Sequence, residues 1–493
     1  MVSTNSSTQV IPAAPVMPGA SARPGDRTPL TPRPASVLIT GLGVISGYGV
    51  GAQLLWAGLN EGPTAVKPIR RVKVGDTPGV CALASEVPAG LSAKDFVPKH
   101  YRKAVKVMVR DTELAVIAAA NAVSDAKLVT RATTPEAGDA SGVSLTYASS
   151  RVGCHIGAGL IPAEAPEIGP AFASSIDAQG QFSVRKWGTV ATPAEGLEGS
   201  GSDPTGGSNG MANLQPLWML KYLPNMLACH VTILHGAEGP SNTITCGEAS
   251  GLLCIGESER VIRRGAADAC FSGGAESKVN LMGLARSALR GRLAESGVPQ
   301  PYNPASPGTV PGEGGGLLML ERSEAARGRG ARAYAGIVGF GAAQSLTRGG
   351  RNGLALAIFA ALKDAGLAAE SIDAVVPQAL GVPEVDRHEI AALREVFGHR
   401  PLPLVTLPPM LGDCSSGGGG LAVSVAALCL HHNTLPAAAI IFTDDAGPAN
   451  AGSTAPLGAG RKKWANEQHN ITHVLVCSGS FSGQNAAVIL AKT

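Results

Sequence analysis

The chain has 493 residues and a formal net charge of +3 at pH 7, and this length predicts two domains or one large duplicated one. Hydrophobic residues make up 44% of the sequence and aromatic residues only 4%, beside 64 glycines. This composition favours close-packed α/β layers over an aromatic-rich β-sandwich. The small charge, without a Lys/Arg run, excludes the electrostatic footprint of a nucleic-acid-binding protein.

The cysteines give no sign of a metal site. Nine of them are scattered along the chain without CxxC or Cys/His ligand spacing, most of them in apolar runs. This pattern predicts buried, reduced thiols in a cytoplasmic protein, and we expect neither a metal nor a cofactor. The longest apolar run, GLAVSVAALCL, is shorter than the roughly 18 residues of a membrane span, so we expect none.

The predicted elements start after a tail. Residues 1–35 are rich in Pro, Ser and Thr and predict a disordered segment. SVLITGLGVIS (36–46) reads as a strand that ends in glycines, and a short helical pattern follows it. Residues 107–128 have the spacing of a long amphipathic helix, and 151–160 that of a buried strand. Residues 161–213 are polar and rich in Gly and Pro, which predicts an inserted loop.

A second series of elements follows in the C-terminal part. Residues 251–268 have helical spacing, and ACFSGGAES after them reads as another buried strand. Alternating strands and helices then start again near residue 334. Two such series predict two similar layered α/β halves, 36–325 and 326–493. The pair GLGVIS and GFGAAQ hints weakly that the halves arose by duplication.

The stretch TITCGEASGL (243–252) joins a strand-like run to a helix. Cys246 is a candidate nucleophile there, because a helix N-terminus lowers a thiol pKa and offers N–H groups to an oxyanion. The alternatives are a small buried residue for Cys246 and an ordinary first-turn acid for Glu248. No histidine in a glycine-rich strand-end loop offers Cys246 a base. The stretch alone leaves both roles open.

Longer segments carry a resemblance. GPSNTITCGEASGLLCIGESERVIRRGAADACFSGGAES, together with VLITGLGVISGYGVG, GEGGGLLMLE and SFSGQNAAVIL in the same order, resembles β-ketoacyl-[acyl-carrier-protein] synthases. The resemblance covers about residues 36–491, without 161–213. It implies the thiolase-like fold of the condensing enzymes, a duplicated five-layered αβαβα architecture. The family's activity is acyl transfer, with a Cys-Ala-Ser-Gly motif at its nucleophile.

The nucleophile is the first functional position that differs. Aligning residues 249–251 with the family's Ala-Ser-Gly puts Glu248, and not Cys246, at the cysteine position. Using Cys246 instead would need a two-residue insertion at a helix N-terminus, where a misplacement of about 1 Å is costly. The resemblance therefore implies that the thiolate is missing.

Both catalytic histidines and the lysine also look replaced. VVPQALGVPEVDRHE resembles the family's first histidine loop, with Gln378 at the histidine and Asp386 retained as its anchor. LPPMLGDCSSGGGGLA resembles the second, with Pro408 for the lysine and Asp413 for the histidine. Glu248, Gln378 and Asp413 would thus occupy the Cys/His/His positions as inactive replacements, because these groups neither accept an acyl chain well nor stabilise an enolate.

Subunits that lack the cysteine exist in this family. They are the chain-length factors of polyketide systems, which pair with an active ketosynthase and shape the acyl tunnel, and usually carry glutamine where this chain has Glu248. The resemblance implies such a partner in fatty acid or polyketide synthesis, whose own partners are an acyl carrier protein and either an active ketosynthase or a second copy of itself. The family dimerises around the segment that corresponds to 226–239, which is apolar and β-branched here.

The expected substrate pocket includes Cys246, Pro408 and Phe481. Phe481 in SFSGQN corresponds to the family's gating phenylalanine, although Ser480 and Ser482 partly replace the flanking glycines. Packing of Phe481 in the core is the alternative.

Two other functions stay open at this stage. Glu248 and Asp413, if they face each other at about 4–6 Å, should raise the pKa of one carboxyl, an arrangement that suits acid/base chemistry. A repurposed enzyme could then hydrolyse or decarboxylate an acyl thioester. The third possibility is acyl transfer through Cys246 or Ser250.

Overall fold

The computed structural model describes residues 31–74, 81–134, 144–187, 214, 217–345, 352–442 and 470–493. Residues 1–30 of the predicted tail and 188–213 of the predicted inserted loop lie outside this part of the chain. Among the described residues, no helix is both long and apolar enough to cross a membrane.

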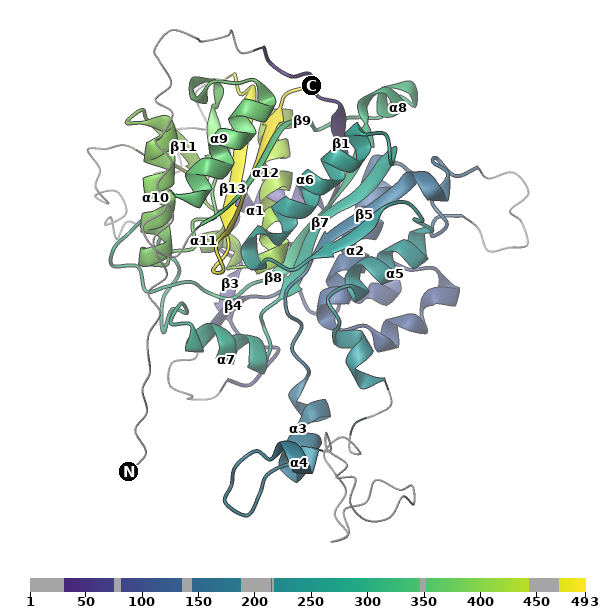
Figure 1. Ribbon diagram of the computed structural model, residues 1–493, viewed down its shortest axis with the longest axis vertical. Coiled ribbons are helices and arrows are strands. Elements are labelled where there is room, and N and C mark those ends of the chain that lie inside the picture. Colours follow the sequence, from purple (N-terminus) through teal and green to yellow (C-terminus); the bar gives the residue numbers. More distant parts are fainter. Residues whose placement is uncertain are drawn as a thin grey trace, which may run out of the picture.

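One large sheet runs through the molecule (Figure 1). Within the described residues it has 12 strands, and its main path has the order β12-β11-β10-β13-β14-β9-β1-β8-β7-β5-β6, with β2 paired to β1. The strands are β1 Val37–Ser46, β2 Gly49–Val50, β5 Val152–Gly157, β6 Ser241–Ile244, β7 Ala269–Ser277, β8 Glu313–Arg322, β9 Ala335–Gln344, β10 Ala374–Val376, β11 Leu402–Val405, β12 Ala439–Phe442, β13 His473–Gly479 and β14 Gln484–Ala491. A small second sheet pairs β3 Val66–Pro68 with β4 Leu83–Ser85.

The two halves of the sheet repeat one topology. Outward from the centre, β1, β8, β7, β5 and β6 follow one another with two antiparallel and then two parallel pairings. From the other central strand, β9, β14, β13, β10 and β11 follow with the same pairings. The halves join where β1 and β9 pair antiparallel, with Val37 opposite Ile337. The hint of duplication from GLGVIS and GFGAAQ falls on these two central strands.

The α-helices of the described residues are α1 Ala52–Asn60, α2 Arg110–Ala126, α3 Ala165–Ser174, α4 Val184–Trp187, α5 Met226–His235, α6 Ser250–Arg263, α7 Leu281–Leu289, α8 Ser323–Gly328, α9 Gly353–Ala365, α10 Pro383–Phe397, α11 Pro408–Leu411 and α12 Gly418–His432. Helices α6 and α12 pack together between the halves, while α2 packs on β1 and β8 and α9 on β9 and β14 (Figure 1). This is the five-layered arrangement that the resemblance implies.

Helix α12 shows why the middle layer forms. It is apolar on every side, and each residue from Gly419 to Leu430 is buried, as expected of a helix enclosed by two layers. Its glycines allow a close approach to the sheet, since a Cβ on Gly420 would lie only 1.9 Å from the carbonyl oxygen of Gly316. A Cβ there would push α12 away from β8.

Two predictions from the sequence need correction, one on where order begins and one on the structure within residues 161–213. Order begins before residue 36, because Arg33 Nε donates a hydrogen bond to the carbonyl oxygen of Val338 at 2.9 Å and Arg33 pairs with Glu259 at 3.0 Å. The segment predicted as an inserted loop contains α3 and α4 in its described part, where the rings of Phe172 and Trp187 lie 5.3 Å apart. The limits of the two predicted halves stay predictions.

Candidate functional site

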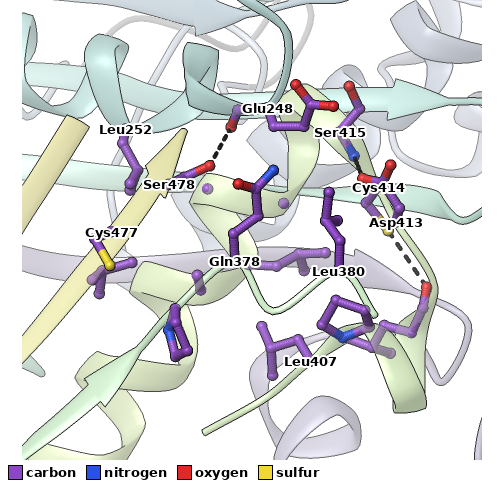
Figure 2. A pocket seen from close by; sticks show the side chains of 18 of the residues that line it. Glu248, Leu252, Gln378, Leu380, Leu407, Asp413, Cys414, Ser415, Cys477 and Ser478 are labelled. Carbon is purple, nitrogen blue, oxygen red and sulfur yellow. Dashed lines mark hydrogen bonds between the residues drawn. The ribbon is translucent and has the colours of Figure 1, made fainter. Parts of the chain in front are cut away.

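Glu248, Gln378 and Asp413 come from three distant parts of the chain and line one cavity (Figure 2). Glu248 lies in the short turn Gly247–Ala249 directly before α6, and Gln378 follows β10. Asp413 lies between α11 and α12, and Pro408 at the start of α11 lines the same cavity. The cavity holds about 50 Å³, little more than a few water molecules need.

Hydrogen bonds fix two of these residues to β13. The hydroxyl of Ser478 donates to the carbonyl oxygen of Glu248 at 3.2 Å, and the backbone N–H of Gly479 donates to Gln378 Oε1 at 3.2 Å. Figure 2 shows the Gln378 side chain extending toward Glu248. Strand β13 therefore helps to position Glu248 and Gln378 in this cavity.

Glu248 forms a buried ion pair. Its Oε1 lies 3.1 Å from Arg292, and their side chains are only 6% and 15% exposed. The Arg292 guanidinium also lies 4.8 Å from the centre of the Phe481 ring, in cation–π geometry. The Glu248 carboxylate is thus neutralised by a cation that follows α7 in the sequence.

Asp413 forms a second buried ion pair, with Lys278 at 2.6 Å. The backbone N–H of Ser415 donates to the other carboxylate oxygen at 2.8 Å. Burial alone would raise the pKa of Asp413, but the charge of Lys278 and these hydrogen bonds outweigh it and lower the pKa. Burial would lower the pKa of Lys278, and attraction to Asp413, Glu248 and Glu276 raises it instead.

The prediction that proximity of Glu248 and Asp413 raises the pKa of one carboxyl is therefore wrong for Asp413, whose pKa is lowered. A raised pKa at Asp413 would have required two acids facing each other without a nearer counter-charge. Lys278 and Arg292 supply a counter-charge to each acid. Asp413 stays ionised at neutral pH and holds no proton for general acid catalysis.

Cys246 and Ser250 are not activated. Burial raises the pKa of the Cys246 thiol, which disfavours the thiolate that a nucleophile needs. The Ser250 hydroxyl donates to the carbonyl oxygen of Gly247 at 2.6 Å and accepts from the backbone N–H of Cys246 at 2.8 Å. Cys246 is not among the residues that line either cavity bordered by Glu248.

Phe481 lies outside the core. Its side chain is 63% exposed, so the alternative that it packs in the core is wrong. It borders a second cavity, of about 290 Å³, that also reaches Glu248 and Lys278. The Arg290 guanidinium also lies 5.4 Å from the ring centre. The aromatic ring thus stands at the outer mouth of the site.

A second acidic cluster lies behind Gln378. The Glu389 carboxylate accepts hydrogen bonds from the backbone N–H groups of Gln378 at 2.8 Å and Ala379 at 2.9 Å, and from the Tyr302 hydroxyl at 3.0 Å. Burial, with the charge of Asp386, raises the pKa of Glu389 to about 7, and burial raises that of Asp386 to about 6. Asp386, retained in the sequence, accepts from the backbone N–H of Tyr302 at 2.8 Å.

Sequence reasoning missed Lys278 and Arg292, which lie far from their partners in the chain. The available signal was indirect, since two buried acids in one pocket require cations, and Lys278 directly follows the predicted strand ACFSGGAES. For metals, the described residues contain no group of three or more metal-ligating side chains.

Comparisons with known proteins identify the family of this chain. The profile of the β-ketoacyl synthase N-terminal domain matches residues 188–326, and that of its C-terminal domain matches 334–441. The first match begins inside 161–213, which corrects the expectation that this whole segment lies outside the resemblance. The two matches together cover half of the chain.

Relatives and solved structures extend the match over more than nine-tenths of the chain. The ketoacyl synthase beta subunit of the tetracenomycin polyketide synthase from Streptomyces glaucescens is 28% identical, over 93% of this chain and 99% of its own. The 3-oxoacyl-[acyl-carrier-protein] synthase 2 of Staphylococcus aureus is 27% identical, over 92% and 98%. The structure of the ishigamide ketosynthase/chain length factor superposes with a TM-score of 0.70 at 23% identity, over 94% of this chain and all of that one. This last likeness shows the thiolase-like fold.

Proposed function

Because this chain belongs to the β-ketoacyl synthase family, we propose that it acts as a non-catalytic, chain-length-determining partner of an active ketosynthase in fatty acid or polyketide synthesis. The observation that carries the proposal is the ion pair of Glu248 and Arg292 at the nucleophile position. A carboxylate held by a guanidinium neither attacks a thioester nor leaves room for one.

The rest of the cavity supports the same conclusion. The positions of the two family histidines hold Gln378 and Asp413, and Asp413 is engaged by Lys278. A cavity of about 50 Å³ is far smaller than the roughly 300 Å³ at which ligand pockets begin. The acyl chain would therefore lie in the catalytic subunit or at the interface with it, and not inside this cavity.

The names of the relatives point in this direction as well. One is a ketoacyl synthase beta subunit, and one structural neighbour is a ketosynthase with a chain length factor. We extend these roles to the present chain, with an acyl carrier protein and a cysteine-bearing ketosynthase as its partners.

The sheet edge supports a partner interface. In the described part of the chain β6 ends the sheet, and its residues Ser241 and Asn242 are exposed. An edge strand offers unpaired N–H and C=O groups to a second chain. Helix α5 packs beside β6 and exposes 66% of Ile233. We propose that the partner docks along β6 and α5.

Native mass spectrometry of the tagged protein from its own cells tests this proposal. We expect a stoichiometric heterodimer with a second, cysteine-bearing ketosynthase. Ile233→Asp should dissociate it, whereas Leu54→Asp, on an exposed site of α1, should leave it intact. A homodimer without any such partner contradicts the proposal.

The alternative of a repurposed acyl-thioester enzyme has less support. Acid/base work by Glu248 and Asp413 needs a carboxyl that holds a proton near neutral pH, and the pKa of Asp413 is lowered instead. Transfer through Cys246 needs a thiolate, and the pKa of this thiol is raised.

A further inference from the structure

A cavity of about 350 Å³ lies apart from the site, between α1 and the C-terminal end of α12. It shares no lining residue with the cavity of Glu248, Gln378 and Asp413. Helix α1 contributes Gln53 and Trp56, and α12 contributes Leu428, His431 and His432, which lie on one face of each helix because they are three or four positions apart. Its volume lies within the range of small-molecule pockets.

Four rings form a continuous ladder along this cavity. Trp56 stacks on His432 with a centroid distance of 4.8 Å and an interplanar angle of 24°. His432 meets His431 edge-on at 5.2 Å, and His431 meets Tyr334 at 5.1 Å. Flat rings of this kind favour a ligand that can stack on them.

The polar groups of the cavity restrict the charge of the ligand. Arg332 is paired with Asp125 at 2.7 Å, and the Tyr334 hydroxyl donates to the same carboxylate at 3.1 Å. Glu61 also borders the cavity. The guanidinium of Arg332 is thus already neutralised, and the lining adds the carboxylate of Glu61, which disfavours an anion.

The imidazoles remain available for a neutral ligand. Among the described residues, none forms a hydrogen bond with the ring nitrogens of His431 or His432. Burial, with the neighbouring His431, lowers the pKa of His432, so this ring is neutral at pH 7 and offers one N–H donor and one acceptor nitrogen.

We propose that this cavity binds a neutral, planar, hydroxylated aromatic molecule. The ring stacks on the exposed part of Trp56 and His432, and its hydroxyl groups hydrogen-bond to the two imidazoles. This site is separate from the replaced active site and goes beyond the proposed function, since partner binding requires nothing of α1 or of the end of α12.

Isothermal titration calorimetry of the full chain with 2,3-dihydroxynaphthalene at pH 7 tests the inference. We expect one equivalent to bind, and cyclohexane-1,2-diol, which has the hydroxyls without the flat ring, to give no heat. His432→Ala, at an exposed position, should weaken binding by about five- to tenfold through the lost stacking, and Trp56→Leu should do the same.

The matched control is His388→Ala, an exposed histidine of α10 away from the cavity, which should bind like the unchanged chain. Circular dichroism confirms that each variant is folded. The inference is overturned if the unchanged chain binds no dihydroxynaphthalene. Equal affinity in His432→Ala and the unchanged chain overturns it too, since the probe then binds elsewhere.

Discussion

Glu248 and Asp413 each form an ion pair with a largely buried cation, whereas Asp386 and Glu389, behind Gln378, form no ion pair with any described residue. The pKa of Asp413 is lowered, while those of Asp386 and Glu389 are raised to about 6 and about 7. The contribution of Asp413 to stability therefore responds to pH in the opposite sense to the contributions of Asp386 and Glu389. The difference shows that burial alone does not set the state of a carboxyl, since the nearest charge decides it.

The signs of the two contributions to stability follow from linkage. A carboxyl with a lowered pKa stabilises the fold above its unfolded value near 4, and this contribution is lost as the pH falls through the folded value. A carboxyl with a raised pKa stabilises the fold most at low pH, and this contribution is lost as the pH rises through the folded value, here about 6 to 7.

The largest expected effect comes from removing the cation of a buried ion pair while its acid stays in place. Lys278→Met leaves Asp413 as an uncompensated buried charge, and we expect a loss of about 3–5 kcal/mol in the free energy of unfolding. Guanidinium chloride unfolding at pH 7 measures it. The double variant Lys278→Met/Asp413→Leu should recover most of the loss, because an apolar pair of similar volume needs no counter-charge.

An exposed lysine provides the control for this pair. Lys94→Met, on a short surface turn, should change the free energy of unfolding by less than about 0.5 kcal/mol. If Lys278→Met lowers the free energy of unfolding no more than Lys94→Met does, the ion pair of Lys278 and Asp413 does not stabilise the fold.

A smaller effect is expected from the second acidic cluster. Raising the pH from 5 to 8 removes the proton from Glu389, so its contribution to the unfolding free energy should fall by the order of 2 kcal/mol. Glu389→Gln should flatten this slope, measured by urea unfolding at four pH values.

Glu384→Gln is the control for Glu389→Gln, because it changes an exposed acid at the start of the same helix. Other buried acids also titrate in this range, so the difference in slope between the unchanged chain and each variant is the quantity to compare. An unchanged slope in Glu389→Gln contradicts the raised pKa.

The smallest effect is expected at the mouth of the site. Phe481→Ala removes the cation–π contacts with Arg290 and Arg292, and exposed contacts of this kind contribute about 0.5–1 kcal/mol. Phe271→Ala, which removes a fully buried ring, should cost about 3–5 kcal/mol, and guanidinium chloride unfolding at pH 7 measures both variants. A comparable loss at both positions would show that Phe481 packs in the fold after all.

The ordered motifs and the resemblance that they carry predicted the duplicated α/β fold, and they implied the common cavity of Glu248, Gln378, Pro408 and Asp413. Sequence reasoning failed on the electrostatics of Asp413, because Lys278 is 135 positions away and nothing local links the two. Arg33 was placed in the disordered tail for a similar reason, since its partners Glu259 and Val338 come from the folded halves. Interactions between distant segments depend on tertiary packing, which local patterns do not encode.

The most direct test of the central claim is intact-mass spectrometry of the purified chain after incubation with an acyl thioester of an acyl carrier protein. The ion-paired Glu248, with Cys246 protonated and Ser250 engaged, predicts no covalent acyl adduct, whereas an active ketosynthase treated in parallel gains one acyl group. A stoichiometric adduct that peptide mapping places on Cys246 or Ser250 would contradict the account and make this chain an acyltransferase.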